Sequence, residues 1–174
     1  MQIQQQHVGW HLWALWTAAT VTGSVLAFPL GWELESSFRT PSELSILLYL
    51  YTTVGIFVGM AQWLVLRLYL PRSGWWPVTT AAGFLTWNVL VGPLQWLVLR
   101  RHLRKAGWWA FTSTLVWLFA MAMGVRVVLA LPHLGWAWSM MSLLALAGFI
   151  AGMLVGALTG LHLVKLLRRP ISVS

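Results

Sequence analysis

Five histidines and three glutamates are the side chains of this 174-residue sequence best suited to proton transfer or metal binding near neutral pH. His7 and His11 are four residues apart, but two imidazoles without a carboxylate or a third ligand make a poor metal site. His162 lies three residues before Lys165 on an apolar stretch, where an imidazole could ligate the metal of a haem or a chlorophyll. We therefore predict no metal site and no catalytic residue, and keep His162 and His11 as candidate cofactor contacts.

The scarcity of acidic residues and cysteines excludes several classes of protein. Asp and Cys are absent, and the three Glu fall between residues 33 and 43, so no long apolar segment carries a carboxylate. Proton-coupled transporters and two-carboxylate hydrolases need acidic groups inside the fold, and thiolate metal sites need cysteine. Nucleotide-binding, zinc-protease and serine-hydrolase motifs are also missing. The sequence therefore predicts a protein that is not an enzyme.

The elements that must position any site are apolar helices. The chain is 59% hydrophobic and 8% charged, with a mean hydropathy of +0.76. Five uninterrupted apolar runs each approach the length of about 20 residues that crosses a bilayer; they are residues 10–30, 44–66, 78–99, 110–131 and 140–164. Residues 1–174 are thus predicted to form a single helical membrane domain, all-α in class.

An internal repeat is the clearest motif in the chain. The phrase QWLVLR occurs at residues 62–67 and again at 95–100, within a longer match between residues 59–76 and 92–109 that ends in GWW. The repeated side chains are Gln62, Trp63 and Arg67 in the first copy and Gln95, Trp96 and Arg100 in the second. A weak third copy at residues 156–169 keeps the glycine, a polar residue three positions later and the basic end. The duplicated amides predict a structural task performed twice, such as bonding a neighbouring helix.

The repeated phrase, together with the sequence GxxTGxxLVxLLRRP near the end of the chain, resembles a family of small polytopic membrane proteins of cyanobacteria and other phototrophic bacteria to which no reaction is assigned. The resemblance covers residues 55–170, whereas the first forty residues match only as a generic helix. Asn88 and Pro93 depart from the Gly-rich text that members often have after GWW. The resemblance implies a phototrophic source, with bacteriochlorophyll, carotenoid or quinone as cofactors that the chain could contact.

Two topologies remain open for residues 78–99. As a full crossing in a five-helix protein, this run separates the two QWLVLR phrases, with eight Lys/Arg inside and three outside. As a re-entrant pair of short helices broken near Asn88 and Pro93, it leaves four transmembrane helices. Both phrases and both termini are then cytoplasmic, with nine Lys/Arg inside and two outside. We favour this second topology because identical phrases suggest identical surroundings, and it predicts that Arg126 pairs with Glu33 or Glu35 at the outer side.

Stripes of glycine predict where helix backbones touch. The last apolar run carries Gly148, Gly152, Gly156 and Gly160, and the second run carries Gly55 and Gly59. We expect the last helix to pack on the second through these stripes. The alternative is that one stripe packs against a partner subunit or the flat face of a pigment or quinone.

The chain is rich in tryptophan, with 14 residues. Those near segment ends are predicted to form an interfacial aromatic belt; they are Trp10, Trp32, Trp75, Trp76, Trp108, Trp109, Trp136 and Trp138. Trp16, Trp87 and Trp117 lie deeper, so they either fill the core or face a hydrophobic ligand. Trp87 and Trp117 are kept as candidate cofactor contacts.

The function expected from these features is that of a non-enzymatic accessory or structural subunit of a photosynthetic or electron-transfer complex. It would lie in the inner, cytoplasmic or photosynthetic, membrane of a bacterium. Its partners would be lipids and other membrane subunits rather than nucleic acid, because the net charge of +8 is concentrated at the ends of apolar segments. The alternative is a small transporter or channel component in which the re-entrant segment and Asn88 line a pore.

Overall fold

The computed structural model describes residues 8–37, 43–70, 72–86, 88–103, 106–130 and 140–168, and within them all regular structure is helical. The helices are α1 (Trp10–Ser36), α2 (Glu43–Leu66), α3 (Trp76–Phe84), α4 (Val91–Leu99), α5 (Gly107–Ala130) and α6 (Met140–Leu167). Three stretches in this described part are long and apolar enough to cross a bilayer: Trp10–Leu34, Leu48–Leu66 and Met141–Leu167. The predicted all-helical class is confirmed, with the apolar helices of a multi-pass membrane protein.

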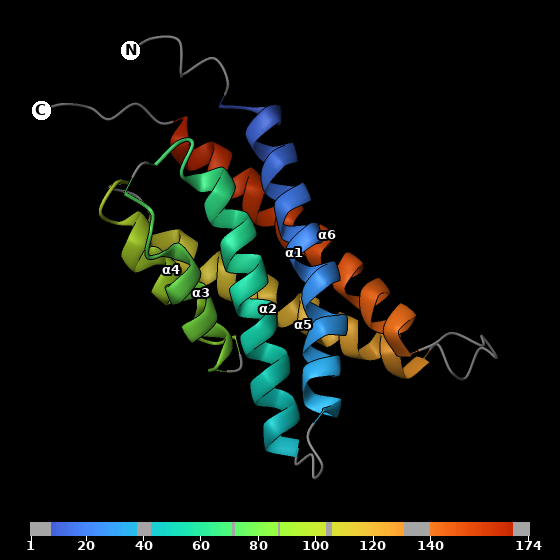
Figure 1. Ribbon diagram of the computed structural model, residues 1–174. Helices are drawn as coiled ribbons and strands as arrows, with labels where there is room; N and C mark the ends of the chain where they lie inside the picture. Colours follow the sequence, from blue (N-terminus) through green and yellow to red (C-terminus); the bar gives the residue numbers. More distant parts are fainter. Residues whose placement is uncertain are drawn as a thin grey trace, which may run out of the picture.

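The helices form a closed ring in sequence order (Figure 1). Each helix packs on the next one along the chain, and α6 returns to pack on α1. The ring therefore consists of three consecutive hairpins, α1–α2, α3–α4 and α5–α6. Their order in space follows their order in the sequence, as it does in repeat proteins built from one supersecondary unit.

The middle hairpin is much shorter than the other two. Helices α3 and α4 have 9 residues each, and α2 has 24. At a rise of about 1.5 Å per residue, these lengths are about 13 Å and about 36 Å. The chain reverses between α3 and α4 at Asn88, whose φ of 64° is a left-handed conformation that Asn tolerates. Thr86 closes the turn by accepting a hydrogen bond from Leu90 N at 3.2 Å. Residues 78–99 are thus two short helices, with the break before Pro93.

The short hairpin brings both repeated loops to one end of the bundle. One core cluster contains residues from the starts of α1, α3 and α5 and from the ends of α2, α4 and α6. We call the end of the bundle that holds this cluster the tryptophan end, and we call the opposite end the far end. The described cations at the tryptophan end are Arg67, Arg72, Arg100, Arg101, Lys165 and Arg168. The three Glu lie at the far end, in the last turns of α1 and the first turn of α2.

The glycine stripe of α6 packs against α1, and the prediction that it packs against α2 is wrong. A Cβ atom added to Gly148, Gly152 or Gly156 would lie 2.7–2.8 Å from backbone atoms of α1, whereas Gly55 and Gly59 face α3. Ring closure is the reason, because it makes α1 the neighbour of α6. A stripe in the sequence indicates that two backbones touch but does not identify the second backbone.

The predicted pair between Arg126 and Glu33 is also absent from the described part of the chain, where both side chains are exposed. Helix α6 stands between α1 and α5 in the ring, so these two residues belong to helices that are not neighbours. The side chain of Glu35 lies outside the described residues.

Candidate functional site

Three tryptophans, one from each hairpin, meet inside the ring near the tryptophan end. The indoles of Trp16, Trp76 and Trp109 have centroids 5.7, 5.9 and 6.1 Å apart and pack edge to face. All three side chains are fully buried. Such edge-to-face contacts are favourable because the positive edge of one ring meets the negative face of another. We call these three residues the tryptophan triad.

Two members of the triad were predicted to belong to the interfacial belt, and this prediction is wrong. Trp76 and Trp109 lie in the core, whereas the preceding residues Trp75 and Trp108 are 62% and 70% exposed. In each GWW loop the second tryptophan turns inward at the start of a helix, and the first is left at the surface. Trp10 is exposed as predicted, and Trp136 and Trp138 lie outside the described residues.

The repeated glutamines bind the triad. Trp76 Nε1 donates to Gln62 Oε1 at 3.1 Å, and Trp109 Nε1 donates to Gln95 Oε1 at the same distance. In each case the indole comes from the hairpin after the one that holds the glutamine. Both amides are buried, so each bond satisfies a donor and an acceptor that would otherwise be isolated from water.

The third indole repeats this arrangement across the closure of the ring. Trp16 Nε1 donates to Thr159 Oγ1 at 2.9 Å, and Thr159 stands three residues after Gly156, as Gln62 stands three residues after Gly59. The weak third copy of the repeat therefore holds the third acceptor. With three indoles bonded to three equivalent positions, the core has approximate threefold symmetry.

Hydroxyl groups complete the network around each amide. Gln62 Nε2 donates to Thr20 Oγ1, and Gln95 Nε2 donates to Thr80 Oγ1, both at 3.0 Å. Ser113 Oγ donates to Gln95 Oε1 at 3.0 Å. These hydroxyls lie four residues after Trp16, Trp76 and Trp109, on the same helix face. The pattern W-x-x-x-[T/S] thus occurs near the start of every hairpin, including the first, where the repeat is not evident from the sequence.

The glycine before each acceptor allows the helices to touch at the triad. A Cβ atom on Gly59, Gly92 or Gly156 would meet the backbone of Pro77, Ala110 or Thr17, respectively, and each of these is the residue after a triad tryptophan. The three glycines therefore have equivalent neighbours. This equivalence explains why glycine, rather than alanine, begins each copy.

The third copy lacks a tryptophan because another helix supplies one. Gly160 stands where the first two copies have Trp63 and Trp96, and a Cβ on Gly160 would lie 3.2 Å from Trp13 Cδ1. The positions equivalent to Trp13 are the small buried residues Ser73 and Ala106. At the interface between α6 and α1, α1 therefore provides the large side chain and α6 the small one. The arginine that follows Trp63 or Trp96 stacks over its indole at 5.3 or 5.1 Å.

The candidate cofactor residues that the structure describes, His162, His11 and Trp117, lie in different surroundings. His162 Nδ1 is 3.0 Å from Thr112 Oγ1, and its ring packs edge-on to Trp109 near the tryptophan end. His11 is an exposed residue of α1. Trp117 is buried in the other core cluster, where it packs on Phe84 with centroids 4.7 Å apart. Trp87 lies outside the described residues, among which no group of three metal-ligating side chains occurs.

The described residues form a bundle of six helices with approximate threefold symmetry, closed by a tryptophan triad, and three of its helices are apolar and long enough to cross a membrane. Comparison with protein-family models, with curated proteins and with solved structures finds no match. The polar groups of the triad network bond to one another, so the core is suited to holding the ring closed.

Proposed function

We propose that this chain is a non-enzymatic accessory or structural subunit of a larger membrane complex. Helices α1, α2, α5 and α6 cross the bilayer, and the hairpin α3–α4 re-enters from the tryptophan end. The observation that carries this proposal is the length of that hairpin. Because α3 and α4 are less than half as long as α2, the far halves of α2 and α5 continue past them with no helix of the described chain in between.

The surface around this gap is apolar. Leu85, Val89 and Leu90 at the turn of the short hairpin are 47%, 52% and 42% exposed. Beyond the turn, leucines continue on the two flanking helices. Leu48 on α2 lies seven residues before Gly55, on the same helix face. Leu118 on α5 lies one turn after Thr114, whose Oγ1 donates to Val89 O in the short hairpin. A helix from another subunit, packed in this space, would take the place of the missing halves of the middle hairpin.

Charge supports the direction of insertion, and the family resemblance supports the type of complex. By position in the sequence, nine Lys/Arg belong to the tryptophan end and two to the far end, so the tryptophan end is cytoplasmic by the positive-inside rule. The resemblance to proteins of phototrophic bacteria supports a photosynthetic or electron-transfer complex. Its bacteriochlorophyll, carotenoid or quinone would then lie beside this chain, against the gap.

A photo-crosslinking amino acid at Val89 tests the proposed partner. We expect a protein adduct of one defined mass when Val89 carries the cross-linker, because this exposed residue lies at the turn of the short hairpin, beside the gap. Met153 on α6 is 41% exposed and serves as the matched control, for which only lipid adducts are expected. Lipid adducts alone at both positions in the native membrane would contradict a subunit role.

Cysteine labelling tests the topology. Gly74 and Gly107 are exposed, and a Cβ on either meets nothing within 4 Å, so Gly74→Cys and Gly107→Cys report accessibility without disturbing the core. The neighbouring Ser73 and Ala106 are buried and would be poor reporters. We expect an impermeant maleimide to label both variants only from the cytoplasmic side, and Ser37→Cys only from the opposite side. Labelling of the two glycine variants from opposite sides would restore a five-helix topology.

One observation favours a transport role as the second candidate. Asn88, at the turn of the short hairpin, is only 2% exposed, and its Oδ1 has no hydrogen-bond partner among the described residues. An amide oxygen held inside a membrane could coordinate a passing ion or water molecule. Measured ion flux into proteoliposomes that Asn88→Leu abolishes, with folding intact, would support this role over that of a subunit.

A further inference from the structure

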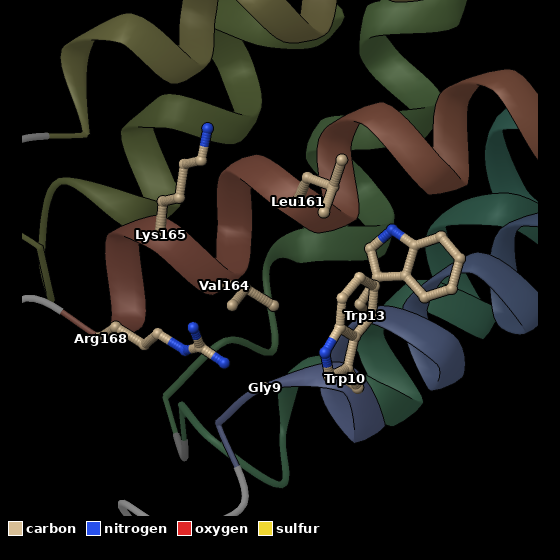
Figure 2. Close-up of a pocket in the computed structure, with 7 residues that line it drawn as sticks. All are labelled: Gly9, Trp10, Trp13, Leu161, Val164, Lys165 and Arg168. Carbon is tan, nitrogen blue, oxygen red and sulfur yellow. The ribbon is translucent and has the colours of Figure 1, made fainter.

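We propose that the groove between the start of α1 and the end of α6 binds an anionic phospholipid. This groove lies at the tryptophan end and has a volume of about 150 Å³ (Figure 2). The inference rests on the membrane placement in the proposed function but not on the partner subunit. The groove lies where the start of α1 meets the end of α6, apart from the gap beyond the short hairpin.

The walls of the groove suit an acyl chain. Trp10 and Trp13 stand on one side with their indoles edge to face, 5.5 Å apart, and Leu161 and Val164 line the side formed by α6 (Figure 2). Trp13 is fixed because its Nε1 donates to Ala157 O at 3.0 Å. Trp10 and Leu161 are exposed, so apolar surface remains available to a methylene chain. A rigid apolar wall of this kind loses little side-chain entropy on binding.

The guanidinium of Arg168 stands at the mouth of the groove. Arg168 Nε donates to Val8 O at 2.8 Å, and this bond holds the guanidinium over Gly9, where an added Cβ would lie 2.7 Å from Nη2. The two Nη groups retain donors for a phosphate, whose oxygens match the fork of an arginine. Lys165 lies almost one turn earlier on α6, with its ammonium directed away from the groove in Figure 2.

The protein supplies no carboxylate side chain to this end. All three Glu lie in turns of α1 and α2 at the far end, and Asp is absent from the sequence. Partial burial raises the pKa of the Tyr69 hydroxyl at the tryptophan end, so this phenol stays neutral and does not serve as a counter-anion. The cations of this end therefore face the charge of lipid headgroups.

The shape of the groove favours a lipid over a free phosphate. A free phosphate would contact the guanidinium but leave the indoles and Leu161 uncovered. A phospholipid contacts the guanidinium and also covers the indoles and Leu161, because its phosphate and its acyl chain are joined at the depth where interfacial tryptophans lie. Exposed Trp75 and Trp108 at the same end of the bundle support this depth.

Native mass spectrometry of the full chain, purified in mild detergent and mixed with equal amounts of dioleoyl phosphatidylglycerol and dioleoyl phosphatidylcholine, tests the site. We expect wild-type protein to retain phosphatidylglycerol preferentially and Arg168→Gln to lower that retention about five-fold. Leu161→Trp, which fills the groove and leaves the charges in place, is expected to lower it as well. Since Leu161 is exposed, this variant keeps the test valid even if Arg168→Gln fails to fold.

The repeat provides matched controls. Arg100→Gln removes a cation that stacks on Trp96 elsewhere at the same end, and Leu97→Trp changes the leucine of α4 that corresponds to Leu161. Both controls are expected to bind phosphatidylglycerol as the wild type does. Equal retention of the two lipids by the wild type, or equal losses in the controls and the groove variants, would overturn the proposal.

Three further outcomes distinguish a lipid from a free anion as the ligand, and distinguish this proposal from the proposed subunit role. Displacement of bound phosphatidylglycerol by excess glycerol phosphate would show a simple anion site and would also overturn the proposal. Selective lipid binding without a cross-linked partner at Val89 would leave this site in place and contradict only the subunit role. A cross-linked partner without lipid selectivity would contradict only this site.

Discussion

Gly156→Leu is expected to open the bundle in mild detergent, whereas Ala18→Leu is expected to leave it folded. A Cβ on Gly156 would lie 2.8 Å from Thr17 Cα and 3.1 Å from Thr17 O, so it would push against backbone that has no freedom to rotate away. Overpacking of a core costs about 1–3 kcal/mol, and separating two helix backbones is expected to exceed that range. The same displacement would pull Trp16 away from Thr159, and with it one side of the triad.

The control must be an exposed position next to the same interface. Ala18 is exposed on α1 and follows Thr17, so Ala18→Leu places a leucine side chain on the outside of the bundle. Ala151 on α6 is unsuitable because it is buried in the core. The measurement is the fraction of monodisperse protein on size-exclusion chromatography after heating. Equal resistance of Gly156→Leu and Ala18→Leu would contradict close packing of α6 on α1.

The second large effect is expected from Gln95→Met, which keeps the volume of the side chain but removes its amide. Trp109 Nε1 and Ser113 Oγ lose their acceptor, and Thr80 Oγ1 loses a donor. Leaving such groups unsatisfied in a buried site is expected to lower the free energy of unfolding by about 2–4 kcal/mol. Thermal unfolding of the detergent-solubilised protein, followed by tryptophan fluorescence, measures the loss.

A comparison within the GWW loop separates this effect from loss of aromatic area. Trp109→Phe removes the same hydrogen bond as Gln95→Met, whereas Trp108→Phe changes an exposed indole one residue earlier. We expect Trp108→Phe to be nearly neutral, and the double variant Gln95→Met with Trp109→Phe to lose less than the sum of the single losses. Strict additivity would show that the amide and the indole act independently.

The sequence predicts the helical class well and the partners of individual side chains poorly. The apolar runs predict helices because a run of that length has no other way to satisfy its backbone in lipid. The break in residues 78–99 follows from the repetition of QWLVLR, since identical phrases in identical surroundings require an even number of helices between them. The duplicated amides of Gln62 and Gln95 predict bonds between helices, and the structure adds that the donors are indoles from the next hairpin.

What the sequence leaves open depends on rotation about helix axes and on ring closure. Trp75 and Trp76 are adjacent and equally apolar, and only the position at which α3 begins decides which of them turns inward. The sequence does not predict that Trp16 and Thr20 of α1 join the network, because W-x-x-x-T is a common pattern until Gln62 is seen beside Thr20. Gly160 makes the third copy weak, because the tryptophan that fills its site is Trp13 of α1.

The closure of the ring between α6 and α1 has a consequence for biosynthesis. The bond from Trp16 to Thr159 joins residues 143 positions apart, so the first helix enters the membrane long before its partner has been translated. Until α6 emerges from the ribosome, the small-residue face of α1 and the indole N–H of Trp16 stand against lipid or against the insertion machinery. The core around the triad is therefore completed only when α6 has been made, and a product that stops before α6 leaves the indole of Trp16 without its acceptor.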